Sequence, residues 1–173
     1  MRLFIAIPVP PDIRRALGAV KRELMQKGAV GRYVPDNNYH VTLHFFGESD
    51  ALCDIADAMH EAVCDARPFL LRLGEYGGFS SRAIKTGVVE MTGDLSELTR
   101  LYEMLESALL ERGFVKSTGR FRPHITIGRN MQGDEVALTQ HNDAFTVNQI
   151  VLYESRSEKG QMVYTPVHKE LFL

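Results

Sequence analysis

A four-residue pattern, His-apolar-Thr-apolar, occurs twice in this chain of 173 residues, as HVTL at 40–43 and as HITI at 124–127. Side chains alternate between the two faces of a β-strand, so each copy predicts a strand with apolar residues on one face and His and Thr on the other. A duplicated strand that serves only packing does not need polar residues on its outer face. The repetition therefore predicts a function for the polar faces, which carry His40, Thr42, His124 and Thr126.

The order of elements around the two copies also repeats. Apolar spacing and turn residues predict a strand, a helix and a motif strand in each half, at 2–9, 12–27 and 39–46 and again at 83–91, 94–112 and 123–128. A helix at 51–66 and strands at 69–77, 145–153 and 162–172 complete the prediction. We expect a single domain, 1–173, made of two similar lobes related by a pseudo-twofold axis. The two motif strands would then form opposite walls of one central cleft.

The helix predicted at 94–112 has a signal at each end. Asp94 stands where an N-cap residue is expected, and Glu97 follows three residues later, as in a capping box. Gly113 stands where the helix is expected to stop.

The two cysteines, Cys53 and Cys64, both fall on the helix predicted at 51–66. Their separation along a helix corresponds to a rise of about 16 Å, which is too long for a disulfide. We therefore expect two reduced cysteines with a packing role in a reducing compartment.

Charge and hydropathy narrow the classes of function. The chain has 20 basic and 22 acidic residues, a net charge of −2 and 45% apolar residues. With this net charge the protein as a whole does not attract nucleic acid by a positive electrostatic field, although a local basic patch is enough to hold a few phosphates. No stretch approaches the roughly 18 apolar residues of a membrane span, and prolines interrupt the apolar run near the amino terminus. We expect a cytoplasmic monomer with no membrane contact and no protein partner.

Four further histidines lie outside the two motifs. His44 shares the face of His40 by strict alternation, two positions along, and is expected to line only the rim of the cleft. Ordinary surface roles are expected for His60, His141 and His168.

Two histidines and two threonines favour acid–base chemistry on a phosphate rather than a metal site. Catalytic zinc normally has three protein ligands, and neither motif carries an acidic neighbour on its polar face. An imidazole pKa near 6.5 allows one ring to donate a proton while the other accepts one, with a maximal rate near neutrality. The hydroxyls of Thr42 and Thr126 can donate hydrogen bonds to anionic oxygens. We therefore expect no metal and no cofactor.

Basic residues around the second motif support an anionic substrate. Between 112 and 129 the chain has five basic residues and no acidic one. Arg122 precedes His124 by two positions and so shares its face, which makes its guanidinium a candidate phosphate ligand. Strict alternation directs Arg129 away from the cleft, and its role is left open.

These stretches resemble the 2H phosphoesterase superfamily, which is named for two His-x-Thr/Ser-x motifs. Within it the chain is similar to the RNA 2′,3′-cyclic phosphodiesterase family, also called the 2′-5′ RNA ligase family. The stretches that carry the resemblance are RLFIAIPVP, YVPDNNYHVTLHFFGE, RPHITIGR and LYESRSEKGQMVYTPV. One departure is Tyr33, where many members have tryptophan, so base stacking by this ring would be weaker.

The resemblance implies an α+β fold with antiparallel sheets flanked by helices and a central active-site cleft. It also implies hydrolysis of 2′,3′-cyclic phosphate ends of RNA to 2′-phosphates without a metal. In this chain His40 would be the proton donor to the departing 3′ oxygen and His124 the proton acceptor that activates water. Thr42 and Thr126 would bind the non-bridging oxygens. The reverse reaction, with a 5′-hydroxyl as nucleophile, would form a 2′-5′ RNA linkage.

Two alternatives remain open at this point. The first is a related activity in the same superfamily, on a 2′-5′ oligonucleotide or on a nucleotide-derived cyclic phosphate. The second is an RNA-end-binding module that holds a phosphate without turning it over. The presence of both histidines argues against the second, because Arg or Lys would serve binding alone.

Overall fold

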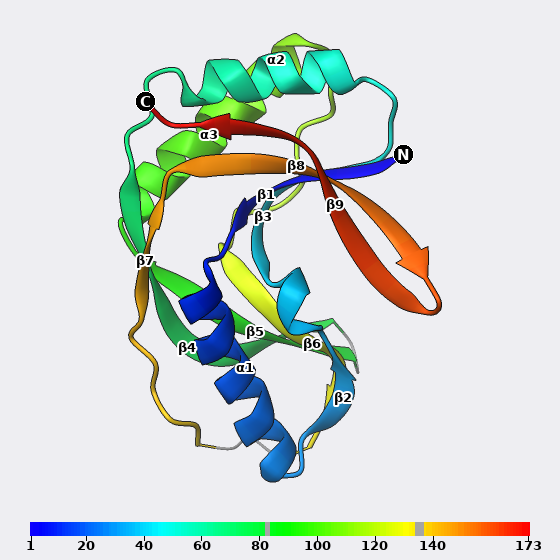
Figure 1. Ribbon diagram of the computed structural model, residues 1–173, viewed down its shortest axis with the longest axis vertical. Helices are drawn as coiled ribbons and strands as arrows, with labels where there is room; N and C mark the ends of the chain where they lie inside the picture. The colour runs from blue at the N-terminus through cyan, green and yellow to red at the C-terminus, as the bar shows by residue number, and fades with distance from the viewer. Residues whose placement is uncertain (82–83, 134–136) are drawn as a thin grey trace.

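The computed structural model describes residues 1–81, 84–133 and 137–173, and within these residues the chain forms two β-sheets and three α-helices (Figure 1). The first sheet has the strand order β3-β1-β8-β9, with β1 Arg2–Pro8, β3 His40–Glu48, β8 Gln149–Glu158 and β9 Gln161–Leu171. The second has the order β2-β6-β5-β4-β7, with β2 Val30–Tyr33, β4 Phe69–Ser81, β5 Ile84–Gly93, β6 His124–Gln132 and β7 Ala144–Val147. All the described strand pairs are antiparallel.

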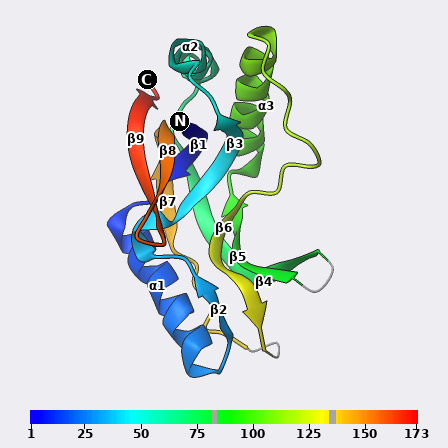
Figure 2. The ribbon, with the colours of Figure 1, turned by 90° about the vertical axis from the view of Figure 1, so that its right-hand side faces the viewer.

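The helices cover the two ends of the molecule. α1 (Pro11–Gln26) lies beside the second sheet, whereas α2 (Leu52–Val63) and α3 (Leu95–Glu111) pack together next to the first (Figures 1 and 2). α1 begins with Pro11 at its first turn and buries a stripe of apolar residues with helical spacing, which consists of Ile13, Leu17, Val20 and Leu24. None of the described helices is long and apolar enough to cross a membrane.

The repeat of strand, helix and motif strand is confirmed in the register of the sheets. In the first sheet β1 pairs with β3, so that Ala6 lies opposite Thr42. In the second sheet β5 pairs with β6, and Val88 lies opposite Thr126. The two halves therefore place their motifs at equivalent positions on equivalent strand pairs.

A β-bulge follows the motif in each half and changes the direction of the residues after it. Leu43 stands between paired Thr42 and His44 without a partner in the register, and Ile127 does the same in β6. One extra residue in a strand interrupts the alternation of its side chains. The strict alternation assumed from the sequence is therefore wrong beyond Leu43 and Ile127.

The bulge buries His44, which contradicts its expected place at the rim of the cleft. Its side chain is 4% exposed and donates from Nδ1 to Oε1 of Glu106 in α3 at 2.6 Å. Ser117 donates its hydroxyl and its amide to the same carboxylate, at 2.9 and 3.0 Å. Burial raises the pKa of Glu106, but the hydrogen bonds from His44 and Ser117 outweigh it and hold that pKa below its ordinary value.

The predicted helix cap at Asp94 is also corrected. Asp94 makes no capping hydrogen bond to α3, and its Oδ2 instead accepts a hydrogen bond from the amide of Leu70 at 2.9 Å. An Asp carboxylate can accept hydrogen bonds from several nearby backbone amides. Here it binds an amide of β4 instead of an amide in the first turn of α3. The capping box with Glu97 is therefore not formed, although the helix does begin at the next residue.

The expected packing role of the cysteines is wrong. Cys53 and Cys64 are both exposed and unpaired. The buried residues of α2 form one stripe, made of Ile55, Ala58, Met59, Ala62 and Val63, and both cysteines lie outside it.

The strand predicted at 145–153 is in fact two strands in different sheets. β7 pairs with β4 in the second sheet, and β8 pairs with β1 in the first. Asn148 lies between them and accepts a hydrogen bond at its carbonyl from the amide of Phe172 at 2.8 Å.

The short strand β2 was not predicted, because it has only four residues and includes Gly31. Residue 83, the first of the strand predicted at 83–91, lies outside the described residues, as does residue 82 before it.

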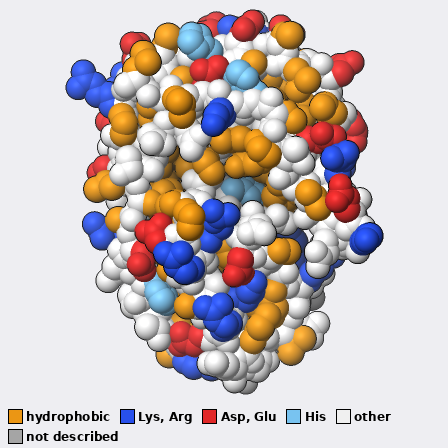
Figure 3. All heavy atoms as spheres, in the orientation of Figure 1, with side chains coloured by type: hydrophobic (Ala, Val, Ile, Leu, Met, Phe, Trp, Pro, Cys, Tyr) orange, Lys and Arg blue, Asp and Glu red, His pale blue; other side chains and the backbone are white. Residues whose placement is uncertain are grey.

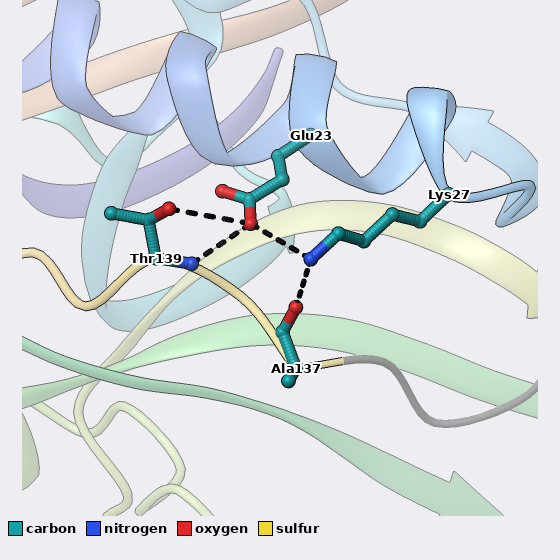
Figure 4. A network of polar contacts seen from close by, with 4 residues as sticks. All are labelled: Glu23, Lys27, Ala137 and Thr139. Atoms are coloured by element: carbon teal, nitrogen blue, oxygen red, sulfur yellow. Dashed lines mark hydrogen bonds and ion pairs between the residues drawn. The ribbon is translucent and has the colours of Figure 1, made fainter.

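A polar network ties α1 to the segment before β7 (Figure 4). Oε1 of Glu23 accepts hydrogen bonds from the amide of Thr139 at 2.9 Å and from Nζ of Lys27 at 3.1 Å. Lys27 also donates to the carbonyl of Ala137. The amide of Thr139 is the main cause of the lowered pKa of Glu23. This segment is therefore held by specific hydrogen bonds at the surface.

We predict that His44→Ala destabilises the protein by about 1–3 kcal/mol, because it removes one hydrogen-bond donor from the buried carboxylate of Glu106 and leaves Ser117 as the donor that remains. Urea unfolding at pH 7, where the lowered pKa keeps Glu106 ionised, measures this loss. His60→Ala is the matched control, since His60 is exposed and its ion pair with Glu170 lies at the surface. Equal unfolding free energies for the two variants would contradict the proposed importance of the buried pair.

Candidate active site

The structure brings the two motifs together from different sheets. His40 begins β3 and His124 begins β6, and these two strands contact each other. The neighbours Val41 and Ile125 are fully buried and fix which face of each strand carries the histidine. The rings are close enough for the charge of His124 to lower the pKa of His40.

Both imidazoles are held in the same way by the backbone. Nδ1 of His40 donates to the carbonyl of Asn38 at 2.7 Å, and Nδ1 of His124 donates to the carbonyl of Arg122 at 2.6 Å. In each case the acceptor lies two residues before the histidine. A proton fixed on Nδ1 leaves Nε2 as the atom that can accept or deliver a proton. Nε2 of His40 also lies 2.9 Å from Oγ1 of Thr42.

Burial and positive charge lower the pKa of both rings. Burial is the largest cause for His40, whose pKa falls to about 4, and the charges of Arg129 and His124 add to it against the opposing effect of the Asn38 carbonyl. Burial also lowers the pKa of His124, with Arg122 and Arg129 adding to it. Both rings are therefore neutral in the free protein at pH 7. The same environment favours a bound anion, which would stabilise the protonated rings.

Arg129 is close enough to both histidines to affect their pKa values, which corrects the direction expected from strict alternation. The bulge at Ile127 shifts the alternation, so Arg129 is exposed, and its charge acts on His40, His124 and Tyr164. Arg122 is exposed as well, and its Nη2 lies 3.4 Å from Oε1 of Glu90, the residue opposite His124 in β5. Two guanidinium groups thus accompany the second motif.

An aromatic wall accompanies the first motif and was not predicted from the sequence. The ring of Phe4 lies 4.9 Å from that of His40, 5.3 Å from Tyr153 and 4.9 Å from Tyr164. Phe45 adds a ring 5.6 Å from Phe4 and is 66% exposed. Its exposure leaves one ring of this aromatic group accessible to a ligand. The sequence did contain one signal for Phe45. It stands 84 residues before Arg129 (129 − 45), the same interval that separates the two motif histidines, so the two residues occupy equivalent positions of the repeat.

The remaining sequence candidates have contacts of their own, and Tyr33 lies opposite Gly128 of β6. The hydroxyl of Tyr33 donates to the carbonyl of Ala29 at 2.6 Å, and its ring packs against the core. His60 and His168 pair with Glu170, and His141 pairs with Asp143. A separate cavity of about 170 Å³ beside α1, lined by Val20, Tyr76 and His141 among others, includes neither motif.

The surface view shows apolar and basic side chains around a histidine. Near the middle of the face in Figure 3 a histidine side chain is visible between apolar side chains above it and basic side chains below it. No group of three or more His, Cys, Asp or Glu residues suited to a metal occurs within the described part of the chain.

Comparison with known proteins places this arrangement in a family. The sequence model of the 2′-5′ RNA ligase superfamily matches residues 9–158. The chain belongs to this superfamily. A relative from Thermotoga maritima, an RNA 2′,3′-cyclic phosphodiesterase, is 33% identical over 135 residues, which cover 75% of this chain and 70% of that protein. A Geobacillus stearothermophilus protein of the same name is 27% identical over 165 residues and 90% of this chain, which spans only 52% of that relative's length.

Two solved structures show the same fold. The protein TT0787 of Thermus thermophilus has a TM-score of 0.86 and 26% identity, with 99% of this chain and 98% of that chain covered. LigT of E. coli, crystallised with 3′-AMP, has a TM-score of 0.76 and 27% identity over 99% of this chain and 97% of that chain. The predicted α+β fold with antiparallel sheets is therefore confirmed.

We predict that Arg129→Met raises the pKa of both His40 and His124, because it removes a positive charge that acts on both rings. NMR titration of the histidine resonances measures the change. Arg67→Met, which removes an exposed charge elsewhere, is the control and should leave both pKa values unchanged. Unchanged values in Arg129→Met would remove Arg129 from the site.

Proposed function

We propose that this protein hydrolyses 2′,3′-cyclic phosphate ends of RNA to 2′-phosphates by acid–base catalysis between His40 and His124. The observation that carries the proposal is the repeated anchoring of the two rings, each with Nδ1 bound to a carbonyl, so that Nε2 is the atom for proton transfer; in His40 this atom lies 2.9 Å from the hydroxyl of Thr42. The family relationship supports the substrate class, since the relatives named above are RNA 2′,3′-cyclic phosphodiesterases.

The reaction needs one proton donor and one acceptor on opposite sides of the phosphorus. Water attacks the phosphorus and loses a proton to Nε2 of His124. The bond between phosphorus and the 3′ oxygen breaks, and that oxygen receives the proton of Nε2 of His40. The products are a 2′-phosphate and a free 3′-hydroxyl, and the proton count of the histidine pair is unchanged.

Hydroxyl and guanidinium groups stabilise the charge that develops on the phosphate. We assign this role to Thr42 and Thr126, each two residues after its histidine, and to Arg122 and Arg129. Such groups contribute most in a site with little water, where preorganised donors face the charge of the transition state. No step requires a metal, because two histidines without a third protein ligand form a poor zinc site.

The aromatic wall offers a place for the nucleoside next to the phosphate. Phe45 is the exposed ring of this wall, and base–aromatic stacking contributes about 1–3 kcal/mol per base. A relative of the same fold, LigT of E. coli, was crystallised in complex with the nucleotide 3′-AMP, which supports a nucleotide as ligand. Reverse ligation to a 2′-5′ linkage would use the same groups with a 5′-hydroxyl in place of water.

We expect the protein to convert a 2′,3′-cyclic nucleotide to the 2′-phosphate, identified by ³¹P NMR, in the presence of excess EDTA. His40→Ala and His124→Ala should each lower kcat by about 10²–10⁴, because each removes one proton transfer. The double variant should be little worse than the slower single variant, since the two groups act in one step.

His60→Ala controls for the loss of a histidine outside the site and should retain wild-type turnover. Near-normal turnover of either folded single variant would exclude that histidine as a proton-transfer group. A 3′-phosphate product would reverse the assigned leaving group. Activity that appears only after metal addition would contradict the metal-free mechanism, whereas binding of the nucleotide without turnover would favour an RNA-end-binding module.

The lowered pKa values move the expected pH optimum to the acid side of neutrality. The free enzyme must carry one proton on the pair, so kcat/KM should be maximal between the pKa of His40, about 4, and that of His124, below its ordinary value of 6.5. It should fall at higher pH, where no donor remains, and at lower pH, where no acceptor remains. A bound phosphodiester anion raises both pKa values, so kcat should be maximal at higher pH than kcat/KM. A kcat/KM maximum at or above pH 7 would contradict this assignment.

A further inference from the structure

The segment 113–123, which we call the basic arm, connects α3 to the second motif. Figure 2 shows it running along one side of the molecule from the end of α3 to β6. It contains three basic residues, Lys116, Arg120 and Arg122, and no acidic residue. Only Arg122 was assigned to the reaction above, so the other two cations have no role in the catalytic step.

Three side chains of the basic arm hold it against the body of the protein. Ser117 donates its amide and its hydroxyl to the buried carboxylate of Glu106. Phe121 stacks on Tyr102 with ring centroids 4.0 Å apart and planes within 2° of parallel. Phe114 meets the ring of Phe46 edge-on at 5.3 Å. The arm is thus ordered by contacts on its inner side.

The cations between these anchors face the solvent. Lys116 and Arg120 are exposed, and neither forms an ion pair with any carboxylate that the structure describes. By contrast, Arg112 just before the arm pairs with Glu61 at 2.9 Å. Because the backbone of the arm is already ordered, binding an anion through these two cations costs side-chain freedom but little backbone freedom.

The distances from His124 to Arg120 and to Lys116 fit an RNA strand that continues away from its reacting end. Arg120 precedes His124 by four residues, so an extended chain places the two at most about 13 Å apart, and Lys116 at most about 26 Å away. A few nucleotides span these distances.

We propose that the basic arm binds backbone phosphates of the RNA strand on the 5′ side of the reacting end, through Lys116 and Arg120. The protein then acts on oligonucleotide ends in preference to free cyclic mononucleotides. This inference rests on the proposed function for its substrate and extends it to a second contact surface. Lys and Arg contacts to phosphate do not depend on base sequence and weaken with salt. This surface therefore raises the affinity for longer RNA strands without favouring a particular base.

The test compares a 2′,3′-cyclic mononucleotide with an RNA hexamer that ends in the same cyclic nucleotide. Wild-type protein should show a higher kcat/KM for the hexamer at low salt. Lys116→Ala/Arg120→Ala should lower kcat/KM for the hexamer by about tenfold and leave the mononucleotide unchanged. The salt dependence for the hexamer should become shallower by about 0.7 per lost contact on a double-logarithmic plot.

Arg67→Ala/Arg100→Ala is the matched control, because it removes the same charge from two exposed arginines near α2 and α3. Equal losses in both double variants would assign the effect to net charge and overturn the inference. Equal kcat/KM for hexamer and mononucleotide in the wild type would also overturn it, while leaving the proposed function intact. If neither substrate is cleaved, the proposed function fails. Fluorescence anisotropy with a hexamer ending in a 2′-phosphate then tests the arm alone, and an unchanged Kd in Lys116→Ala/Arg120→Ala would overturn the inference.

Discussion

In β3 and β6 the face that carries each histidine is fixed by the burial of Val41 and Ile125 on the opposite face. The apolar residues hold the strand against the core, and the period of two then directs His and Thr outward together. The other features of the site depend on this orientation. The carbonyl two residues back can meet Nδ1 only because the ring leaves the strand on that side. The bulge after each motif then changes the alternation and brings Phe45 or Arg129 to the exposed side.

The buried pair of His44 and Glu106 connects the two halves of the molecule. His44 lies just after the first motif, whereas Glu106 lies on the helix that precedes the second. Ser117 joins the same carboxylate from the segment that leads into β6. A single buried charge therefore aligns one motif strand with the approach to the other.

The sequence was sufficient for the repeated order of elements and for the face that His and Thr share in each motif, because both depend on local periodicity. It was not sufficient for His44, Phe45 or Arg129, since their directions are set by bulges that arise from pairing with β1 and β5. Asp94 bonds the amide of Leu70, a partner 24 residues away that local spacing does not identify. The strand predicted at 145–153 was split because pairing with two different sheets, rather than local propensity, divides it at Asn148. The catalytic roles of His40 and His124 stay predictions, as do the roles of the two threonines and of Arg122.

The difference between Phe45 and Arg129 gives the duplicated site a polarity. Two equivalent histidines related by a repeat would treat the two ester oxygens of a cyclic phosphate alike, and either oxygen could leave. An aromatic ring on one side and a guanidinium on the corresponding position of the other remove that equivalence. Under the proposed function, a nucleoside that stacks on one side would enter in a single orientation, and regioselective bond cleavage would follow from the two divergent residues rather than from the two histidines.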